Sequence, residues 1–90
     1  MSEYKKIIEH YGEARQKLEA VEKLNDLAEQ LIQDIERNKC SRGKTLDKFA
    51  DVKIMLEQIL IIYGISGKEI EHREFIKLHK KIKRIEKETV

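Results

Sequence analysis

The stretch LDKFADVKIMLEQIL, residues 46–60, decides the fold because its apolar residues recur at helical spacing. Spacings of three and four place side chains on one face of an α-helix. Further apolar residues widen this face until it covers most of the circumference. The face consists of Phe49, Val52, Leu56, Ile59 and Tyr63, widened by Ile54, Met55 and Ile62. Such a helix is typical of the centre of a bundle, or of a helix shared between subunits.

The same stretch carries charged side chains on one flank of the predicted helix. Asp47, Lys48 and Asp51 are three or four residues apart, so their side chains can meet. Acidic side chains in this arrangement are typical of one half of a metal site. The lysine among them therefore requires an explanation.

A second long helix is predicted from Glu13 to about Asn38. Its apolar residues form one stripe at spacings of three and four. The stripe consists of Leu18, Val21, Leu24, Leu27, Leu31 and Ile35. A polar loop, NKCSRGK, then separates the two long helices. Thr45 is the predicted N-cap of the helix after the loop, and Asp47 is expected in its first turn.

Two further helices are predicted at the ends of the chain. Ser2 can cap a short helix that runs to about Tyr11 and ends at Gly12. The sequence YGISG breaks the central helix, and a last helix begins near Ser66 or Gly67. Its apolar residues form a narrow seam of the coiled-coil type. The seam consists of Phe75, Leu78, Ile82 and Ile85.

The predicted fold class is therefore all-α, with four helices in a single domain spanning residues 1–90. Two long antiparallel helices combine with a short N-terminal helix and a basic C-terminal helix. A composition without proline, with four glycines and 40% charged residues, favours helices over strands. No apolar run exceeds the five residues 59–63, so no membrane span is expected.

The single cysteine, Cys40, excludes an internal disulfide and a zinc site built from several thiolates. The N-terminus lacks the apolar core of a secretory signal. These features favour a reducing, cytoplasmic setting.

A chain of this size buries only about 60% of its unfolded surface, so its own core is small. The wide apolar face of the central helix therefore predicts self-association, most simply a two-fold dimer. The alternative, in which all of this face is intramolecular core, stays open at this point.

The formal net charge of +2 is too small to indicate nucleic acid, but it is unevenly distributed. Residues 77–90 hold six Lys or Arg and two Glu, which gives this segment +4. A basic last helix can contact phosphate or an acidic partner. The simpler interpretation is a solvated helix face.

Several motifs together resemble the MazG-like all-α nucleoside-triphosphate pyrophosphohydrolases, in particular their short phage-borne members. These motifs are HYGEARQ, AVEKLNDLAEQLIQDI, a loop ending in GK, and LDKFADVKIMLEQILIIYGI. The resemblance extends roughly from Glu9 to Ile85. It implies two helical signatures, EExxE and ExxD, from which four carboxylates hold Mg²⁺. In the family this ion holds the triphosphate while water attacks it.

The resemblance places the first signature on residues 22–26 and the second on residues 48–51. The four ligand positions then read Lys23, Asp26, Lys48 and Asp51, with Glu22 beside them. Two of the four expected carboxylates are lysines, one on each helix. Two ammonium groups supply the positive charge that Mg²⁺ would have brought, and a lysine cannot orient water as the metal does.

The sequence therefore predicts a self-neutralised remnant of a metal site, with no catalytic residue, no bound metal and no cofactor. Two alternatives stay open. A shifted register would pair Asp26 with Glu29 and Asp47 with Asp51, which restores four carboxylates and Mg²⁺-dependent hydrolysis. In the other alternative, the charges are ordinary surface pairs without function.

The function expected from this site is binding rather than catalysis. The first hypothesis is a homodimeric regulator or inhibitor that binds an unidentified protein. The second is a nucleotide sensor without hydrolysis, which requires Lys23 and Lys48 to face an open pocket. A residual enzyme comes third. Nucleic-acid binding comes last, because Glu86 and Glu88 alternate with the basic residues of the last helix.

Overall fold

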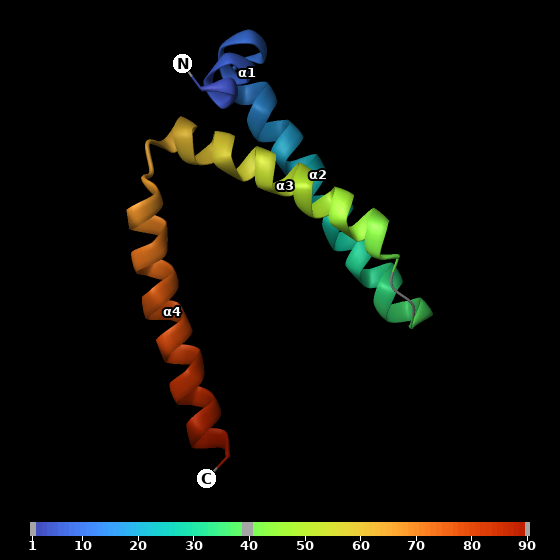
Figure 1. The fold of residues 1–90 in the computed structure, drawn as a ribbon, viewed down its shortest axis with the longest axis vertical. Helices are drawn as coiled ribbons and strands as arrows, with labels where there is room; N and C mark the ends of the chain where they lie inside the picture. The colour runs from blue at the N-terminus through green and yellow to red at the C-terminus, as the bar shows by residue number, and fades with distance from the viewer. Residues whose placement is uncertain (1, 39–40, 90) are drawn as a thin grey trace.

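The computed structural model describes residues 2–38 and 41–89, and its regular elements are four α-helices (Figure 1). They are α1 (Glu3–Tyr11), α2 (Glu13–Arg37), α3 (Arg42–Tyr63) and α4 (Gly67–Glu88). The all-α prediction with four helices is confirmed. The part of the predicted loop that holds Cys40 lies outside the described residues. None of the described helices is long and apolar enough to cross a membrane.

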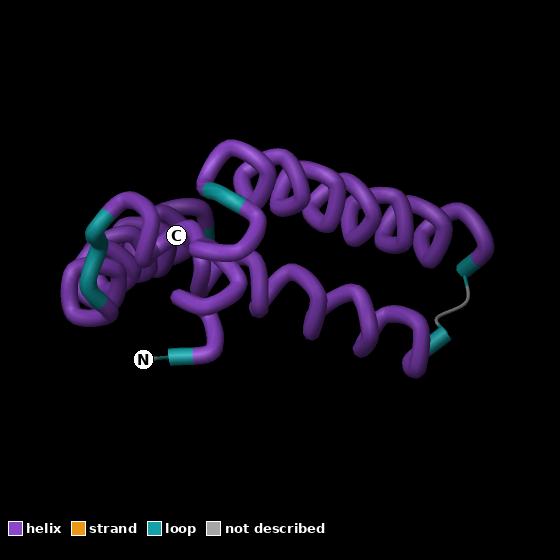
Figure 2. Tube along the Cα trace, turned by 90° about the horizontal axis from the view of Figure 1, so that it is seen from above, coloured by secondary structure: helices purple, strands orange, loops and turns teal. Residues whose placement is uncertain are grey.

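The two long helices α2 and α3 form an antiparallel hairpin, as predicted (Figure 2). Near the start of α2, Gln16 bonds to Gln58, which lies near the end of α3. Near the end of α2, Asp34 accepts a hydrogen bond from Thr45, which lies near the start of α3. These two contacts fix the direction and the register of the pair.

Helix α1 is short and packs on both long helices. Its first turn is capped by Ser2, whose hydroxyl accepts a hydrogen bond from the Lys5 N–H at 3.2 Å. Gly12 follows with φ +93°, a backbone conformation that glycine adopts at little cost and that ends α1. Both boundaries agree with the sequence prediction.

The predicted start of α3 is wrong by one turn. The helix begins at Arg42, and Ser41, with an extended backbone, is the N-cap in place of Thr45. The Thr45 N–H already bonds to the Ser41 carbonyl at 3.0 Å, as inside a helix. The Thr45 hydroxyl donates to Asp34 on α2 at 3.3 Å, so this side chain links the two helices. Asp47 consequently lies beyond the first turn of α3.

The buried core of the single chain is small. Its apolar members are Ala20, Val52 and Met55, and two glutamines, Gln16 and Gln58, are buried beside them. Most of the apolar stripe residues are exposed instead. They include Leu18, Val21, Leu24, Leu31 and Ile35 on α2, and Phe49, Ile54, Leu56 and Tyr63 on α3. The alternative in which the whole apolar face is intramolecular core is therefore wrong.

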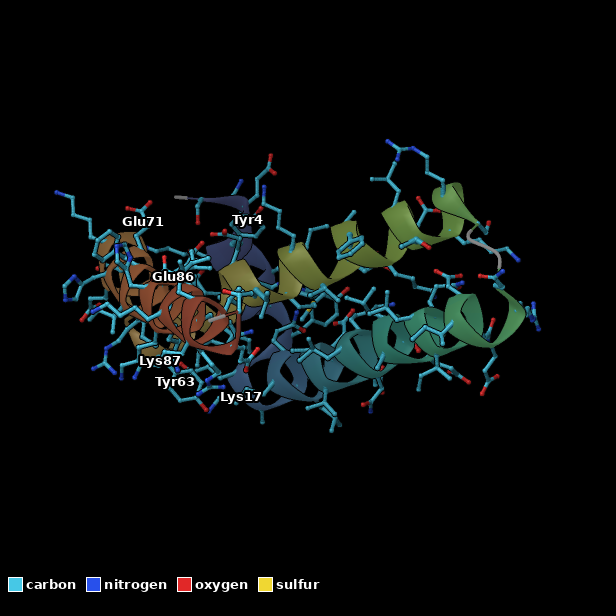
Figure 3. The ribbon with its side chains drawn as sticks, turned by 90° about the horizontal axis from the view of Figure 1, so that it is seen from below. Tyr4, Lys17, Tyr63, Glu71, Glu86 and Lys87 are labelled. Atoms are coloured by element: carbon cyan, nitrogen blue, oxygen red, sulfur yellow. The ribbon has the colours of Figure 1, made fainter. Side chains whose placement is uncertain are left out.

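Tyr63 illustrates how little covers the end of α3. Its side chain is 60% exposed. The Lys17 ammonium lies 4.5 Å from the centroid of its ring, which adds a cation–π contact between α2 and α3 (Figure 3).

Helix α4 packs against none of the other three helices (Figure 1). Its seam residues are exposed; they are Phe75, Leu78, Ile82 and Ile85. The radius of gyration is 16.7 Å, whereas a compact domain of this length has about 12 Å. The extended shape and the uncovered apolar residues indicate an oligomer or a protein partner.

The start of α4 is nevertheless well defined, because Ser66 and Glu69 form a capping box. The Ser66 hydroxyl accepts from the Glu69 N–H at 3.2 Å, and the Glu69 carboxylate accepts from the Ser66 N–H at 2.7 Å. The hydrogen bond from the Ser66 backbone, followed by that from its side chain, lowers the pKa of Glu69. Helix α4 is therefore a separate, capped helix whose apolar seam has no partner within the described chain.

Candidate functional site

The hairpin brings the predicted remnant site onto the facing sides of two helices. Lys23 and Asp26 lie on α2, and Lys48 and Asp51 lie on α3. All four side chains are half-buried, whereas Glu22 is exposed. The four positions that the resemblance assigns to metal ligands therefore lie along the inter-helix surface, rather than on the outer faces of the hairpin.

One cross-helix ion pair forms within this group. The Lys48 ammonium lies 4.0 Å from the Asp26 carboxylate, and their side chains are 35% and 42% exposed. At this distance and exposure, the pair contributes at most about 1 kcal/mol to stability. Lys23 and Asp51 form no ion pair within residues 2–38 and 41–89. The lysine on α3 thus lies beside Asp26, and the resemblance assigns both positions to metal ligands.

The described residues contain no group of three or more His, Cys, Asp or Glu side chains placed to hold a metal ion. This finding also applies to the shifted register. Its additional acids, Glu29 and Asp47, are both exposed. The structure therefore does not assemble the four carboxylates of that register into a cluster among the described residues.

Sequence reasoning missed a buried glutamine pair about two helical turns from Lys23 and Asp51 of the remnant site. Gln16 and Gln58 are each 1% exposed, and the Gln16 amide donates to the Gln58 amide oxygen at 2.7 Å. The Gln58 amide in turn donates to the Met55 sulfur at 3.7 Å. The Gln16 oxygen, Oε1, is buried without a hydrogen-bond partner. The available signal was the position of Gln58, three residues after Met55 and directly before Ile59 on the apolar face of the central helix.

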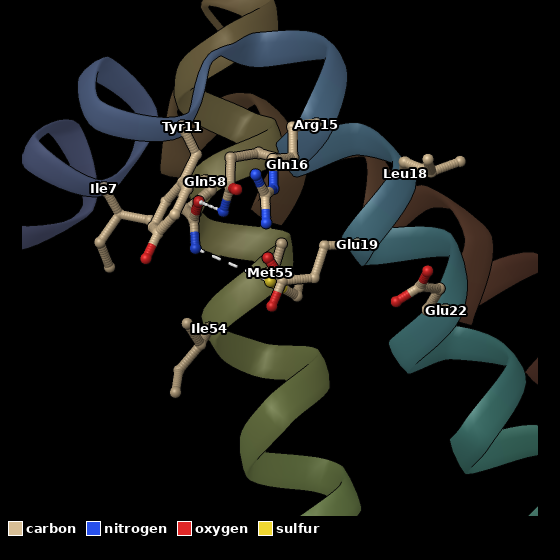
Figure 4. Close-up of a pocket in the computed structure, with 10 residues that line it drawn as sticks. All are labelled: Ile7, Tyr11, Arg15, Gln16, Leu18, Glu19, Glu22, Ile54, Met55 and Gln58. Carbon is tan, nitrogen blue, oxygen red and sulfur yellow. Dashed lines mark hydrogen bonds between the residues drawn. The ribbon is translucent and has the colours of Figure 1, made fainter.

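These glutamines border a cavity of about 640 Å³ at the junction of α1, α2 and α3 (Figure 4). The lining residues come from all three helices. They are Ile7 and Tyr11 on α1, then Arg15, Gln16, Leu18, Glu19 and Glu22 on α2, and Ile54, Met55 and Gln58 on α3. Among the residues of the remnant site, only Glu22 lines this cavity. Neither Lys23 nor Lys48 lines this cavity.

No protein-family model matches the chain, and searches of curated proteins and of solved structures return no match. The resemblance to MazG-like enzymes therefore rests on the sequence motifs alone. The structure itself supports an all-α protein of four helices, with α2 and α3 long and in contact.

The first prediction concerns the two lysines of the remnant site. The double variant Lys23→Glu/Lys48→Glu creates four facing carboxylates, whose mutual repulsion a divalent cation relieves. We expect isothermal titration calorimetry to show Mg²⁺ binding at least about tenfold tighter than in the unaltered protein.

The matched control is Lys44→Glu/Lys53→Glu, which makes the same charge change at exposed positions of α3. Equal Mg²⁺ binding by both double variants would show that net charge, rather than this set of four positions, determines the affinity.

Proposed function

We propose that this chain is a catalytically degenerate MazG-like protein that works by binding, as a regulator or inhibitor of another protein. The observation that carries the proposal is the contact between Lys48 and Asp26 at two expected metal-ligand positions. A cationic side chain there opposes Mg²⁺ electrostatically and cannot activate water as the metal would. The proposal includes no cofactor. It includes a reducing, cytoplasmic setting, in keeping with a single cysteine.

The geometry of the lysines favours protein binding over nucleotide sensing. A sensor would need Lys23 and Lys48 free to contact phosphate oxygens in an open pocket. Lys48 instead lies against Asp26, and neither lysine lines the cavity of about 640 Å³. Phosphate contacts would have to compete with the ion pair that the chain already makes.

The second part of the proposal is self-association. We propose that a second copy of the chain covers the apolar faces. Its support is the number of exposed stripe residues on α2 and α3, together with the seam on α4. In a two-fold dimer, each stripe can pack against the same stripe, or against the adjacent one, of the second copy. One chain alone leaves Leu24 45% and Phe49 52% exposed. The small core of the chain makes this additional burial valuable for stability.

The outer face of α4 offers a surface for the regulated protein. Five exposed basic residues recur at spacings of four, three, four and three, so they share one face of the helix. They are Arg73, Lys77, Lys80, Arg84 and Lys87. This stripe lies opposite the apolar seam. Glu86 falls on another face, whereas Glu88, four residues after Arg84, lies at the edge of the stripe. When the seam is covered, the stripe stays accessible, and its charge fits an acidic protein surface.

We predict that the dimer depends on the apolar stripe of α2. Replacing Leu24 by Asp places a charge in the self-association surface and should weaken the dimer by about 2 kcal/mol, or about thirtyfold in dissociation constant. Light scattering coupled to size-exclusion chromatography over a dilution series measures this change.

The control for this experiment is Asn25→Asp, which introduces the same acid at the neighbouring exposed position. Leu78→Asp tests the seam of α4 separately. A protein that is monomeric at all concentrations, or a dimer that tolerates both Leu24→Asp and Leu78→Asp, would contradict self-association through these faces.

The functional prediction concerns both catalysis and protein binding. The purified protein should hydrolyse no nucleoside triphosphate with Mg²⁺ or Mn²⁺. In a nuclease-treated lysate of the source cell, it should capture a defined protein, and Lys80→Glu/Arg84→Glu should abolish that capture because it reverses the basic stripe.

The control here is Lys5→Glu/Lys6→Glu, which reverses two exposed charges on α1 and should leave capture intact. Metal-dependent hydrolysis would contradict the proposed function. So would capture of nucleic acid from an untreated lysate when the nuclease-treated lysate yields no protein.

A further inference from the structure

Helix α4 carries an apolar seam that no other described part of the chain covers. Its side chains recur at spacings of three, four and three, and each is more than half exposed; they are Phe75, Leu78, Ile82 and Ile85. Figure 1 shows α4 leaving the end of α3 and running apart from the α2–α3 hairpin. Spacings of three and four are those of the a and d positions of a coiled-coil heptad. The surface that fits this seam is therefore a helix with the same pattern.

The heptad also assigns positions to the charged and polar side chains beside the seam. With Ile82 at an a position, Glu74 and Lys81 occupy g positions, directly before an a residue. His79 and Glu86 occupy e positions, directly after a d residue. All four side chains are exposed, and none takes part in a salt bridge within residues 2–38 and 41–89. Side chains at e and g reach the paired helix, so their charges determine its orientation.

A parallel pair of α4 helices brings complementary side chains together. In this orientation, each g residue faces the e residue five positions later on the other helix. Lys81 then faces Glu86 of the second copy, which is a pair of opposite charges. Glu74 faces His79 of the second copy, which is not a like-charge contact. Two-fold symmetry repeats both contacts, so the parallel pair has no repulsion between its e and g positions.

An antiparallel pair that overlaps the whole seam brings like charges together instead. In that orientation g faces g, so Lys81 faces its own copy and each Glu74 faces Glu88 of the other helix. Like charges at such positions destabilise the pair. The parallel pair has one exposed like-charge contact, between the two copies of Glu71, at the d position before the seam begins. The charges as a whole therefore favour the parallel orientation.

We propose that α4 pairs with α4 of a second copy as a parallel, two-stranded coiled coil. This inference rests on the self-association in the proposed function and specifies its geometry. The seam spans ten residues, or about 15 Å, so the pair acts together with the apolar stripes of α2 and α3. The residues of the basic stripe occupy only c and f positions, which face away from the paired helix. Two basic stripes then run in the same direction on opposite sides of the pair, each available to an acidic protein surface.

The first experiment tests the orientation by disulfide cross-linking of the full chain. Glu71→Cys, in a Cys40→Ser background, places one thiol at a d position. Mild oxidation should cross-link most of the dimer, because d residues of a parallel pair lie opposite each other, within the reach of a disulfide. In the antiparallel overlap, residue 71 lies level with residue 89, about 27 Å from its own copy. The matched control, Arg73→Cys at an f position, should form no cross-link.

The second experiment reverses the charges at one g position and one e position. Lys81→Glu and Glu86→Lys should each weaken the dimer about tenfold in sedimentation equilibrium, because two attractive contacts become repulsive. The double variant Lys81→Glu/Glu86→Lys should restore the dissociation constant to within about twofold. Lys80→Glu, which makes the same charge change at an f position, should leave the dimer unchanged. Helix α4 packs against none of the other three helices, so these variants leave the fold of the hairpin intact.

Two results would overturn the parallel pairing while leaving self-association in place. The first is a dimer in which Glu71→Cys forms no cross-link, whereas a mixture of Glu71→Cys and Thr89→Cys chains does. The second is a dimer that both single charge reversals leave unchanged, or that the double variant does not restore. A chain that is monomeric at all concentrations would overturn the pairing and the self-association together.

Discussion

The register of the antiparallel pair α2–α3 is the constraint on which the rest of the structure depends. It places Gln58 against Gln16 near one end, Lys48 against Asp26 along the pair, and Thr45 against Asp34 near the other end. A change of register would move each of these side chains away from its partner. The cavity, the remnant site and the uncovered apolar faces are therefore consequences of one pairing.

The pairing also explains why the single chain is incompletely covered. Two helices in contact can bury only the sides that face each other, and α1 is too short to cover more than one end. Helix α3 is apolar around most of its circumference, so its remaining sides carry exposed residues such as Phe49 and Leu56. Helix α4 stands apart with its own apolar seam. These exposed apolar side chains would be covered in an oligomer or in a complex with a protein partner.

Local signals allowed most of the helix boundaries to be predicted from sequence. Ser2, Gly12 and Ser66 each act on the backbone within one turn, so the chemistry of the residue determines the boundary. The predicted start of α3 was wrong because serine and threonine are both common N-cap residues. The helix begins after Ser41, whose side chain makes no capping hydrogen bond, and the Thr45 hydroxyl bonds to Asp34 on another helix. Periodicity identified which residues share a face, but it holds no information about what covers that face.

The role of the candidate site stays a prediction, whereas the helices that hold its residues agree with the sequence analysis. The facing positions of Lys23, Asp26, Lys48 and Asp51 followed from the motifs and the helical period, and the cross-helix contact of Lys48 with Asp26 was one of the pairs expected. The pair of Gln16 with Gln58 joins residues 42 positions apart. Only the three-dimensional register shows that these two glutamines meet and leave one oxygen without a donor.

The central claim is that the ammonium of Lys48 replaces a metal ion at this site. The most direct measurement is the melting temperature of the unaltered protein during titration with Mg²⁺ and Mn²⁺ at constant ionic strength. A ligand that binds only the folded state raises the melting temperature in a saturable manner. We predict an unchanged melting temperature with both ions. A saturable increase would contradict the claim, because it would show that the folded protein holds a divalent cation despite its lysines.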